Sequence, residues 1–339
     1  MTYGLTPSFT DNLVLRRYKH FVWLHERLVD KFGTVIAIPP LPWKLAIGIA
    51  GEDVLEKRRI RLQSFTDRIC RHPVLSNSSV WKHFIEEVDE KKRTEGKRKS
   101  EEETNIRCSF LTNIQAVRIN EEAKNTFDEK INRFSNTIND LKRAVNNMTI
   151  ITKDQITKYV KIHNKGYRNI GKAFYQLGFS MSGELSQFIQ IGASYQEMSS
   201  LWDKQVTKEW EPLHHVMQGY KGLAEGWQVI LRLYENMRDN QKEIMKLDDN
   251  EIEKEASIDR LNMYRIAVES KRSFFGQEVI LDMANSGQTF LKKQISFHGK
   301  LAEKLKEIHT KCGFDSIVDY LNDMMECQGS VNPESIFIN

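Results

Sequence analysis

The feature that most constrains this chain is a long stretch almost without proline. Five of the seven prolines lie within the first 73 residues, and Pro212 is the only one between Pro73 and Pro333. Proline inside a helix removes a backbone donor and clashes with the preceding turn, so long helices form where it is rare. The sequence therefore predicts a short mixed N-terminal part and a much longer helical part.

Apolar side chains in the helical part recur at alternating steps of three and four residues, which is the period of one helix face. The first stripe comprises Phe127, Ile131, Phe134, Ile138, Leu141, Val145 and Met148, continued by Ile156, Val160, His163, Tyr167, Ile170, Phe174 and Leu177. The second comprises Leu213, Met217, Tyr220, Ala224, Trp227, Leu231 and Tyr234, and the third Leu291, Ile295, Ala302, Leu305 and Ile308. This spacing predicts three long helices, separated near 178–184 and 247–251.

The first stripe contains one irregular step, from Met148 to Ile156. An extra residue rotates an apolar stripe by about 100° around the helix, so we expect a kink between these two residues. Three such rods form a bundle too thin to bury every aromatic ring, which favours self-association. A monomeric spectrin-like bundle fits the same spacing.

Positive charge is concentrated at the N-terminus. The whole chain has a formal charge of only +4, but residues 1–85 hold 13 Lys and Arg against 7 Asp and Glu. The segment 16-RRYKHFVWLHERL-28 mixes these cations with aromatic rings. It fits an anion site, in which guanidinium groups bind phosphate and a ring covers the ligand. It also fits a strand-to-helix junction with Phe21, Leu24 and Leu28 in the core and the charges on a solvated face.

Several function classes have no support in the sequence. We find no nucleotide-binding glycine loop and no zinc-protease motif, and adjacent His214 and His215 point to different sides of a helix. Four scattered cysteines and an N-terminus without a signal peptide favour a reduced, cytosolic protein. No apolar run reaches the roughly 20 residues that span a bilayer. We therefore expect a non-enzymatic protein without a metal or cofactor, and any membrane contact to be peripheral.

The N-terminal motifs carry a family resemblance. RRYKHF, IPPLPWK, EKRRIRLQSF and RHPVL together resemble a Phox-homology (PX) domain, a phosphoinositide-binding module. With GKRK and FHGKLAEKLKEI further on, the chain is similar to endocytic sorting nexins of the sorting nexin 9 type, in which a BAR domain follows PX. The resemblance implies an α+β PX module at 1–88, a linker at 89–109, an all-α BAR domain of three long kinked helices at 110–310 and a tail at 311–339. The BAR domain would form a coiled-coil-like homodimer.

The resemblance also implies the roles of individual residues. Arg17 would bind the 3-phosphate, Tyr18 would stack on the inositol ring and Lys44 would bind the 1-phosphate. Arg58 would hold the side of the 4- and 5-hydroxyls. The linker run of Lys97, Arg98 and Lys99 would contact the anionic leaflet, where each basic residue contributes on the order of 1 kcal/mol.

Two departures from the family pattern are expected. The chain would lack the Src-homology-3 domain and the first PX strand. Residues 239–257, at the expected BAR tip, hold 7 Asp and Glu against 3 Lys, which disfavours membrane contact there.

The resulting prediction is a protein that binds phosphoinositide membranes and remodels their curvature in endocytosis and vesicle trafficking. It would be cytoplasmic, peripheral on the plasma membrane, endocytic vesicles and early endosomes, and in contact with endocytic machinery. The alternative is a helical structural adaptor that binds protein partners without recognising lipid. Nucleic-acid binding fits poorly, because the basic residues cluster around a proline loop instead of forming a stripe.

Overall fold

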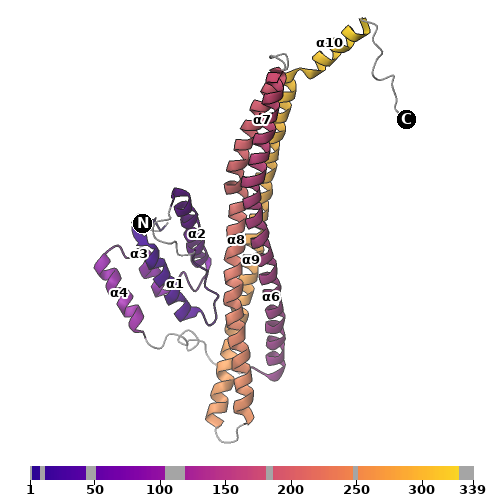
Figure 1. Ribbon diagram of the computed structural model, residues 1–339. Coiled ribbons are helices and arrows are strands. Elements are labelled where there is room, and N and C mark those ends of the chain that lie inside the picture. The colour runs from indigo at the N-terminus through magenta and orange to yellow at the C-terminus, as the bar shows by residue number, and fades with distance from the viewer. Residues whose placement is uncertain are drawn as a thin grey trace. The chain divides into compact units, whose positions relative to one another are not determined.

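The computed structural model describes residues 2–7, 12–42, 51–103, 119–180, 186–246 and 251–327. The chain divides into two units, one of Met1–Thr149 with His215–Met283 and one of Ile150–His214 with Ala284–Asn339. The elements (Figure 1) are β1 (Thr2–Leu5), β2 (Val14–Arg17), α1 (Tyr18–Phe32), α2 (Glu52–Arg71), α3 (Ser79–Glu86), α4 (Glu90–Glu102), α6 (Glu121–Lys158), the π-helix η1 (Tyr159–His163), α7 (Asn164–Ser180), α8 (Ser186–Lys246), α9 (Glu251–Cys312) and α10 (Phe314–Cys327).

The N-terminal part of the first unit has the predicted α+β composition. β1 and β2 pair antiparallel, and α1 to α3 follow. Phe21 on α1 is central to the core, because its ring makes edge contacts with Tyr3, Phe65 and Phe84 at centroid distances of 6.0, 6.5 and 5.1 Å. Such edge-to-face pairs add specific attraction to the burial of apolar area.

The two arginines of the RRY motif have different environments. Arg16 is 2% exposed, and its guanidinium donates to the carbonyls of Phe84, Leu15 and Glu87 at 2.9, 3.0 and 2.6 Å. Burial, followed by the nearby charge of Arg93, lowers the pKa of Arg16 to about 10. Arg16 therefore joins β2 to the end of α3. The strand-to-helix interpretation is wrong about this charge, because Arg16 is buried and does not lie on a solvated face.

The long helices of the first unit meet through aromatic side chains. Phe134 of α6 contacts Trp227 of α8 at 4.9 Å and Phe275 of α9 at 6.3 Å between ring centroids. All seven positions predicted for the stripe on α8 are buried. The predicted breaks between the long helices are confirmed, since α7 ends at Ser180 and α8 at Lys246.

The structure has an irregular segment just after the predicted kink between Met148 and Ile156. α6 continues as an α-helix to Lys158, and the irregular segment is the π-helix Tyr159–His163. A π-turn takes up one extra residue within a continuous helix. The extra residue in the sequence period is therefore accommodated later than the step between the stripes predicted.

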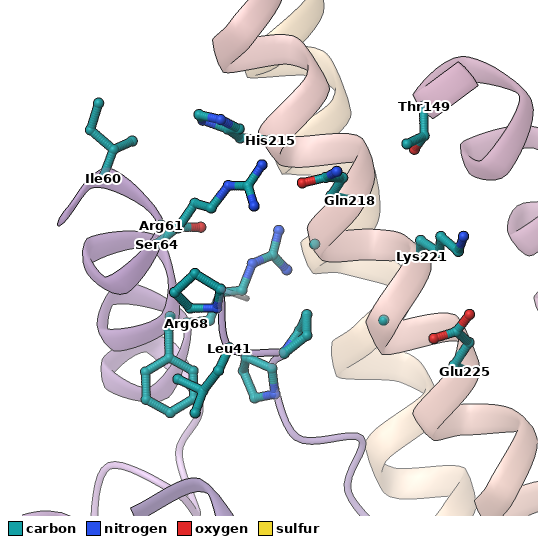
Figure 2. A pocket seen from close by; sticks show the side chains of 16 residues that line it. Leu41, Ile60, Arg61, Ser64, Arg68, Thr149, His215, Gln218, Lys221 and Glu225 are labelled. Carbon is teal, nitrogen blue, oxygen red and sulfur yellow. The ribbon is translucent and has the colours of Figure 1, made fainter. Parts of the chain in front are cut away.

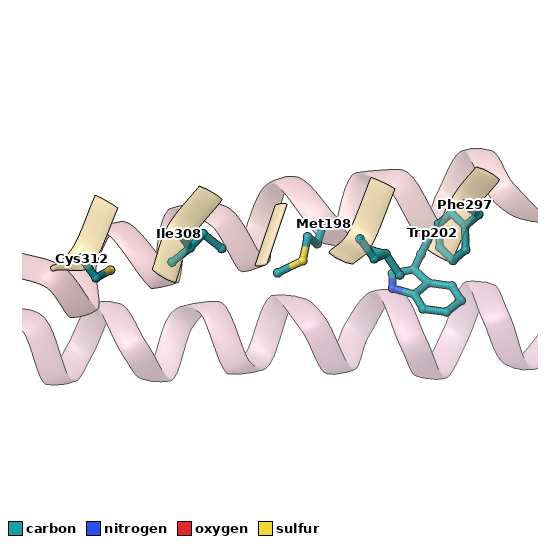
Figure 3. Packing of buried hydrophobic residues seen from close by; sticks show 6 residues of the cluster. Met198, Trp202, Phe297, Ile308 and Cys312 are labelled. Carbon is teal, nitrogen blue, oxygen red and sulfur yellow. The ribbon is translucent and has the colours of Figure 1, made fainter. Parts of the chain in front are cut away.

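The second unit has its own apolar core. The core contains Met198, Trp202, Phe297, Leu301, Ile308 and Cys312 (Figure 3). Trp202 of α8 contacts Phe297 of α9 at a centroid distance of 4.5 Å and stacks with His163 at 4.8 Å. Of the third predicted stripe, Ile308 belongs to this core, whereas Leu291, Ile295 and Leu305 are exposed.

Pro212 lies inside α8, where its missing N–H leaves the carbonyl of Lys208 without its helical partner. Lys293 of α9 donates to that carbonyl from Nζ at 2.6 Å. One residue further on, Gln294 donates to the Glu209 carboxylate at 2.6 Å. Burial raises the pKa of Glu209 to about 7, although Lys293 opposes the shift. Lys293 and Gln294 of α9 therefore supply hydrogen-bond donors beside Pro212 in α8.

Candidate functional site

Two of the predicted ligand-binding residues lie together on the first unit. The Arg58 guanidinium carbon lies 4.6 Å from the centroid of the Tyr18 ring, and the Tyr18 hydroxyl donates to the Pro42 carbonyl. Burial raises the pKa of Tyr18, while the charge of Arg58 opposes that shift. The pair connects the start of α1, the middle of α2 and the proline-rich loop, so a cation and an aromatic face adjoin that loop.

Arg17 is not brought into this pair. It is exposed at the end of β2, and its backbone N–H donates to His20 Nδ1 at 3.1 Å. Arg17 lines a separate cavity of about 350 Å³ together with Lys19, His20 and Arg93. Lys44, the fourth predicted residue, lies outside the residues that the structure describes.

The predicted membrane-contact residues lie on α4. Lys97, Arg98 and Lys99 are exposed, and each forms an ion pair one turn away, with Glu101 at 3.6 Å, Glu102 at 3.4 Å and Glu95 at 3.2 Å respectively. Exposed pairs of this kind contribute little to stability and are screened by salt. The three cations can therefore exchange these partners for another anion at small cost.

A cavity of about 320 Å³ adjoins the proline-rich loop (Figure 2). Its walls come from that loop, from α2 and from α8, and Arg61 extends from α2 toward the His215 and Gln218 side of α8. The loop packs tightly here, since a Cβ on Gly222 of α8 would lie 2.6 Å from the ring of Pro40. The proline loop is therefore supported by a long helix.

A buried ion network that sequence reasoning missed supports the same region. Arg68 of α2 is 6% exposed, lies 2.9 Å from Asp282 of α9 and stacks over the Tyr220 ring at 4.3 Å. Arg71 pairs with the same carboxylate at 2.8 Å. Although burial acts to raise it, the bond from Arg71 and the charge of Arg68 hold the pKa of Asp282 below its usual value. The sequence offered one signal for this network. It is the pair of carboxylates Glu278 and Asp282, one turn apart on α9, whose charge is opposite to that of the arginines of α2.

None of the helices in the described ranges combines the length and apolarity needed to cross a bilayer. Across those same ranges, no three His, Cys, Asp or Glu side chains are grouped to hold a metal ion.

Two family models match the chain. The PX domain model matches residues 5–88, and the model of the WASP-binding domain of sorting nexin proteins matches residues 89–313. The segment with Tyr18 and Arg58 therefore falls in the first match and the long helices in the second.

Similar curated proteins include sorting nexin lst-4 of Caenorhabditis elegans, 30% identical over 91% of this chain and 56% of that protein. Human sorting nexin-33 is 27% identical over 91% and 55%, and mouse sorting nexin-18 is 29% identical over 94% and 54%. The chain thus spans about half the length of these relatives.

Among solved structures, the cryo-EM structure of the SNX-BAR Mvp1 tetramer aligns with a TM-score of 0.60 at 18% identity, over 91% of this chain and 94% of that one. At this identity the likeness shows the fold, a PX module followed by BAR helices.

Proposed function

Because the chain belongs to the sorting nexins that join a PX domain to a WASP-binding BAR domain, we propose that it binds phosphoinositide-bearing membranes and remodels their curvature during endocytosis and vesicle trafficking. The observation that carries this proposal is the stacking of Arg58 on Tyr18 beside the proline-rich loop. A cation and a ring in contact suit a phosphorylated sugar, since the guanidinium binds phosphate and the ring covers the apolar face.

Within this proposal each part of the chain has a role. Residues 1–88 recognise the headgroup through Tyr18 and Arg58, and Arg17 and Lys44 bind its phosphates. Residues 89–109 connect the modules and bring Lys97, Arg98 and Lys99 to the anionic leaflet. Residues 110–310 form the BAR domain, and 311–339 form a tail. The protein acts by binding and is neither an enzyme nor dependent on a cofactor.

Homodimerisation is part of the proposal. Large apolar side chains on α9 are exposed in the single chain, among them Ile280 at 72%, Leu291 at 60% and Ile295 at 72%. Leu291 and Ile295 lie one turn apart on α9, and neighbouring exposed apolar side chains mark association sites. The dimer would be of the sorting nexin 9 type and peripheral on the plasma membrane, endocytic vesicles and early endosomes, in contact with endocytic machinery.

Liposome co-sedimentation tests the proposal. The chain should sediment with vesicles that contain phosphoinositide and much less with vesicles of neutral lipid. Arg17→Ala and Lys44→Ala should each weaken this binding, because one charge-assisted contact contributes about 1.5 to 3 kcal/mol. Equal sedimentation of both variants and the parent would rule out the headgroup assignment. Absence of any lipid binding would favour a structural adaptor that binds only proteins.

A further inference from the structure

A third cavity, a cleft between α1, α3 and α4 on the first unit, shares Lys19, His20 and Arg93 with the cavity of Arg17, and neither Tyr18 nor Arg58 lines it. Its volume is about 310 Å³. Lys19, Arg93 and Lys97 supply cations to its lining, and the rings of Trp23 and Phe84 supply apolar surface. In Figure 1, α4 lies beside α1 and α3, apart from α2. The cleft is therefore a cationic site formed by the helix that follows the PX module.

The charges that line this cleft are mostly positive. They come from Arg16, Lys19, Arg93 and Lys97. The acidic residue of the lining, Glu90, forms an ion pair with Arg93 at 2.8 Å. The pKa of His20 is lowered to about 4. Burial is the largest cause, and the charges of Arg93, Arg16, Lys19 and Arg17 add to it. The cations that add to this shift also repel one another. An anion in the cleft would offset that repulsion.

Close packing holds Arg93 in place. A Cβ on Gly96 of α4 would lie 2.4 Å from the His83 ring, so α4 approaches α3 only because residue 96 has no side chain. The Nε2 atom of His83 lies 3.1 Å from the carbonyl oxygen of Arg93. Arg93 Nη1 in turn lies 2.9 Å from His20 Nδ1 and 3.1 Å from His20 Nε2, so the guanidinium is in contact with the imidazole ring. The arginine is thus oriented from both sides before any ligand arrives.

We propose that this cleft binds a phosphate monoester, with Arg93 and Lys19 as the ligating side chains and Trp23 as the apolar wall. Arginine presents paired donors that match phosphate oxygens, and lysine adds a point charge. The inference goes beyond the proposed function, because the Tyr18–Arg58 pair plays no part in it. A phosphorylated lipid headgroup and a free inositol phosphate share this chemistry.

Titration of the purified chain with inorganic phosphate and with soluble inositol trisphosphate, at constant ionic strength, tests the site. The readout is the imidazole NMR signal of His20, assigned with His20→Asn. Bound phosphate should raise the pKa of His20, since an anion favours the imidazolium. Lys19→Ala and Arg93→Gln should each weaken binding about tenfold or more, as expected for loss of a charge-assisted contact.

Two controls make the outcome decisive. Lys92→Ala removes a cation from the exposed face of the same helix and should leave the affinity unchanged. Arg58→Ala should also leave it unchanged, which separates this site from the headgroup site of the proposed function. Unaltered affinity in Lys19→Ala and Arg93→Gln, or an equal loss in Lys92→Ala, would overturn the proposal.

Gly96→Val provides a variant that removes no charge. The larger side chain should push α4 away from His83 and lower the affinity for soluble phosphate, while circular dichroism shows the helices retained. Full affinity in this variant would contradict a site built by α4.

Vesicle binding in an Arg58→Ala background identifies the source of the phosphate. A further loss on adding Lys19→Ala assigns the ligand to phosphoinositide lipid. No further loss, with soluble binding intact, assigns it to free inositol phosphate. Failure of vesicle binding in general would count against the proposed function alone, because the soluble titration does not depend on it.

Discussion

The guanidinium of Arg58 lies over the ring of Tyr18, 4.6 Å from its centroid, and the hydroxyl of that ring donates to the carbonyl of Pro42. Three segments that are distant in sequence therefore converge on one side chain. A cation over an aromatic face contributes about 0.5 to 2 kcal/mol, depending on how far the pair is removed from water.

Arg58→Ala should weaken binding to phosphoinositide vesicles by roughly tenfold or more, because it removes a charge-assisted contact. The control is Arg59→Ala, since Arg59 is exposed and bound to Glu56 by two hydrogen bonds of 2.8 and 2.7 Å. Arg59→Ala should bind like the parent. Equal losses in both variants, measured by co-sedimentation, would mean that the net charge of α2 and not the Arg58 site determines binding.

Reversal of Lys97, Arg98 and Lys99 to glutamate should abolish the tubulation of liposomes. The reversal removes three cations and places new carboxylates one turn from Glu101, Glu102 and Glu95, so α4 would repel an anionic leaflet. Electron microscopy of liposomes measures the effect.

The matched comparison is neutralisation of Asp248 and Asp249, which lie outside the described residues and within the acidic segment 239–257. This variant should tubulate as well as the parent or better. Tubules that persist after the reversal on α4, or that vanish after this neutralisation, would place the membrane-facing charge elsewhere.

Ile295→Asp should dissociate the homodimer without unfolding the single chain, because this side chain is 72% exposed there. An obligate dimer buries well above about 2,000 Å² in its interface, and a charge at its apolar centre is costly. Light scattering at low micromolar concentration measures the mass. Ile252→Asp, at an 82% exposed position near the start of α9, is the control and should leave the mass unchanged. A parent protein that is already monomeric would remove the dimer from the proposal.

Acid should destabilise the chain through His72. Burial, with a smaller effect of Lys271, lowers the pKa of His72 from 6.5 to about 4, and Nδ1 accepts from the N–H groups of Val74 and Leu75 at 3.2 and 3.3 Å. The unfolded chain binds a proton first, so this contribution is complete above pH 6.5 and is lost as the pH falls toward 4. The loss is on the order of 3 kcal/mol.

His72→Asn tests this prediction, because an amide oxygen can replace Nδ1 as the acceptor but does not titrate. Thermal unfolding between pH 7 and pH 4 should show a smaller fall in Tm for His72→Asn than for the parent. Parallel curves would show that the protonation of His72 is not coupled to unfolding.

Gly171→Val should destabilise the second unit by about 1 to 3 kcal/mol, since a Cβ at this position would lie 2.8 Å from the carbonyl oxygen of Gly192 on α8. Gly166→Ala on the same helix is the control. No atom lies within 4 Å of a Cβ there, so the change should stabilise the helix by about 0.5 to 1 kcal/mol. Chemical denaturation of both variants should give shifts of opposite sign.

The sequence predicted the helices better than the faces they present. Each stripe position on α8 is buried because that helix contacts its own chain on one face. On α9, Phe297 and Leu301 are buried while Leu291 and Ile295 are exposed. This helix therefore has two apolar faces, and only one of them packs within the chain. Periodicity identifies an apolar face but does not show whether it packs within the chain.

In the candidate site, too, motifs predicted some residues, whereas contacts with distant segments of the chain could not be predicted. Resemblance to a family pointed to Tyr18 and Arg58, which the structure places in contact. The difference between Arg16 and Arg17 depends on the carbonyls of Phe84 and Glu87, which are 68 and 71 residues from Arg16. No pattern within the RRY motif contains that information. The ion network of Arg68 depends likewise on Asp282 of a distant helix.

The hydrogen bond from Lys293 to the carbonyl of Lys208 fixes the alignment of α9 along α8. An apolar period repeats along each helix, whereas a carbonyl freed by proline occurs at one position only. Any slippage would separate that carbonyl from its donor and the Glu209 carboxylate from Gln294. Pro212 thereby specifies the alignment of two helices, and through it the positions along α9 that remain available to a second copy of the chain.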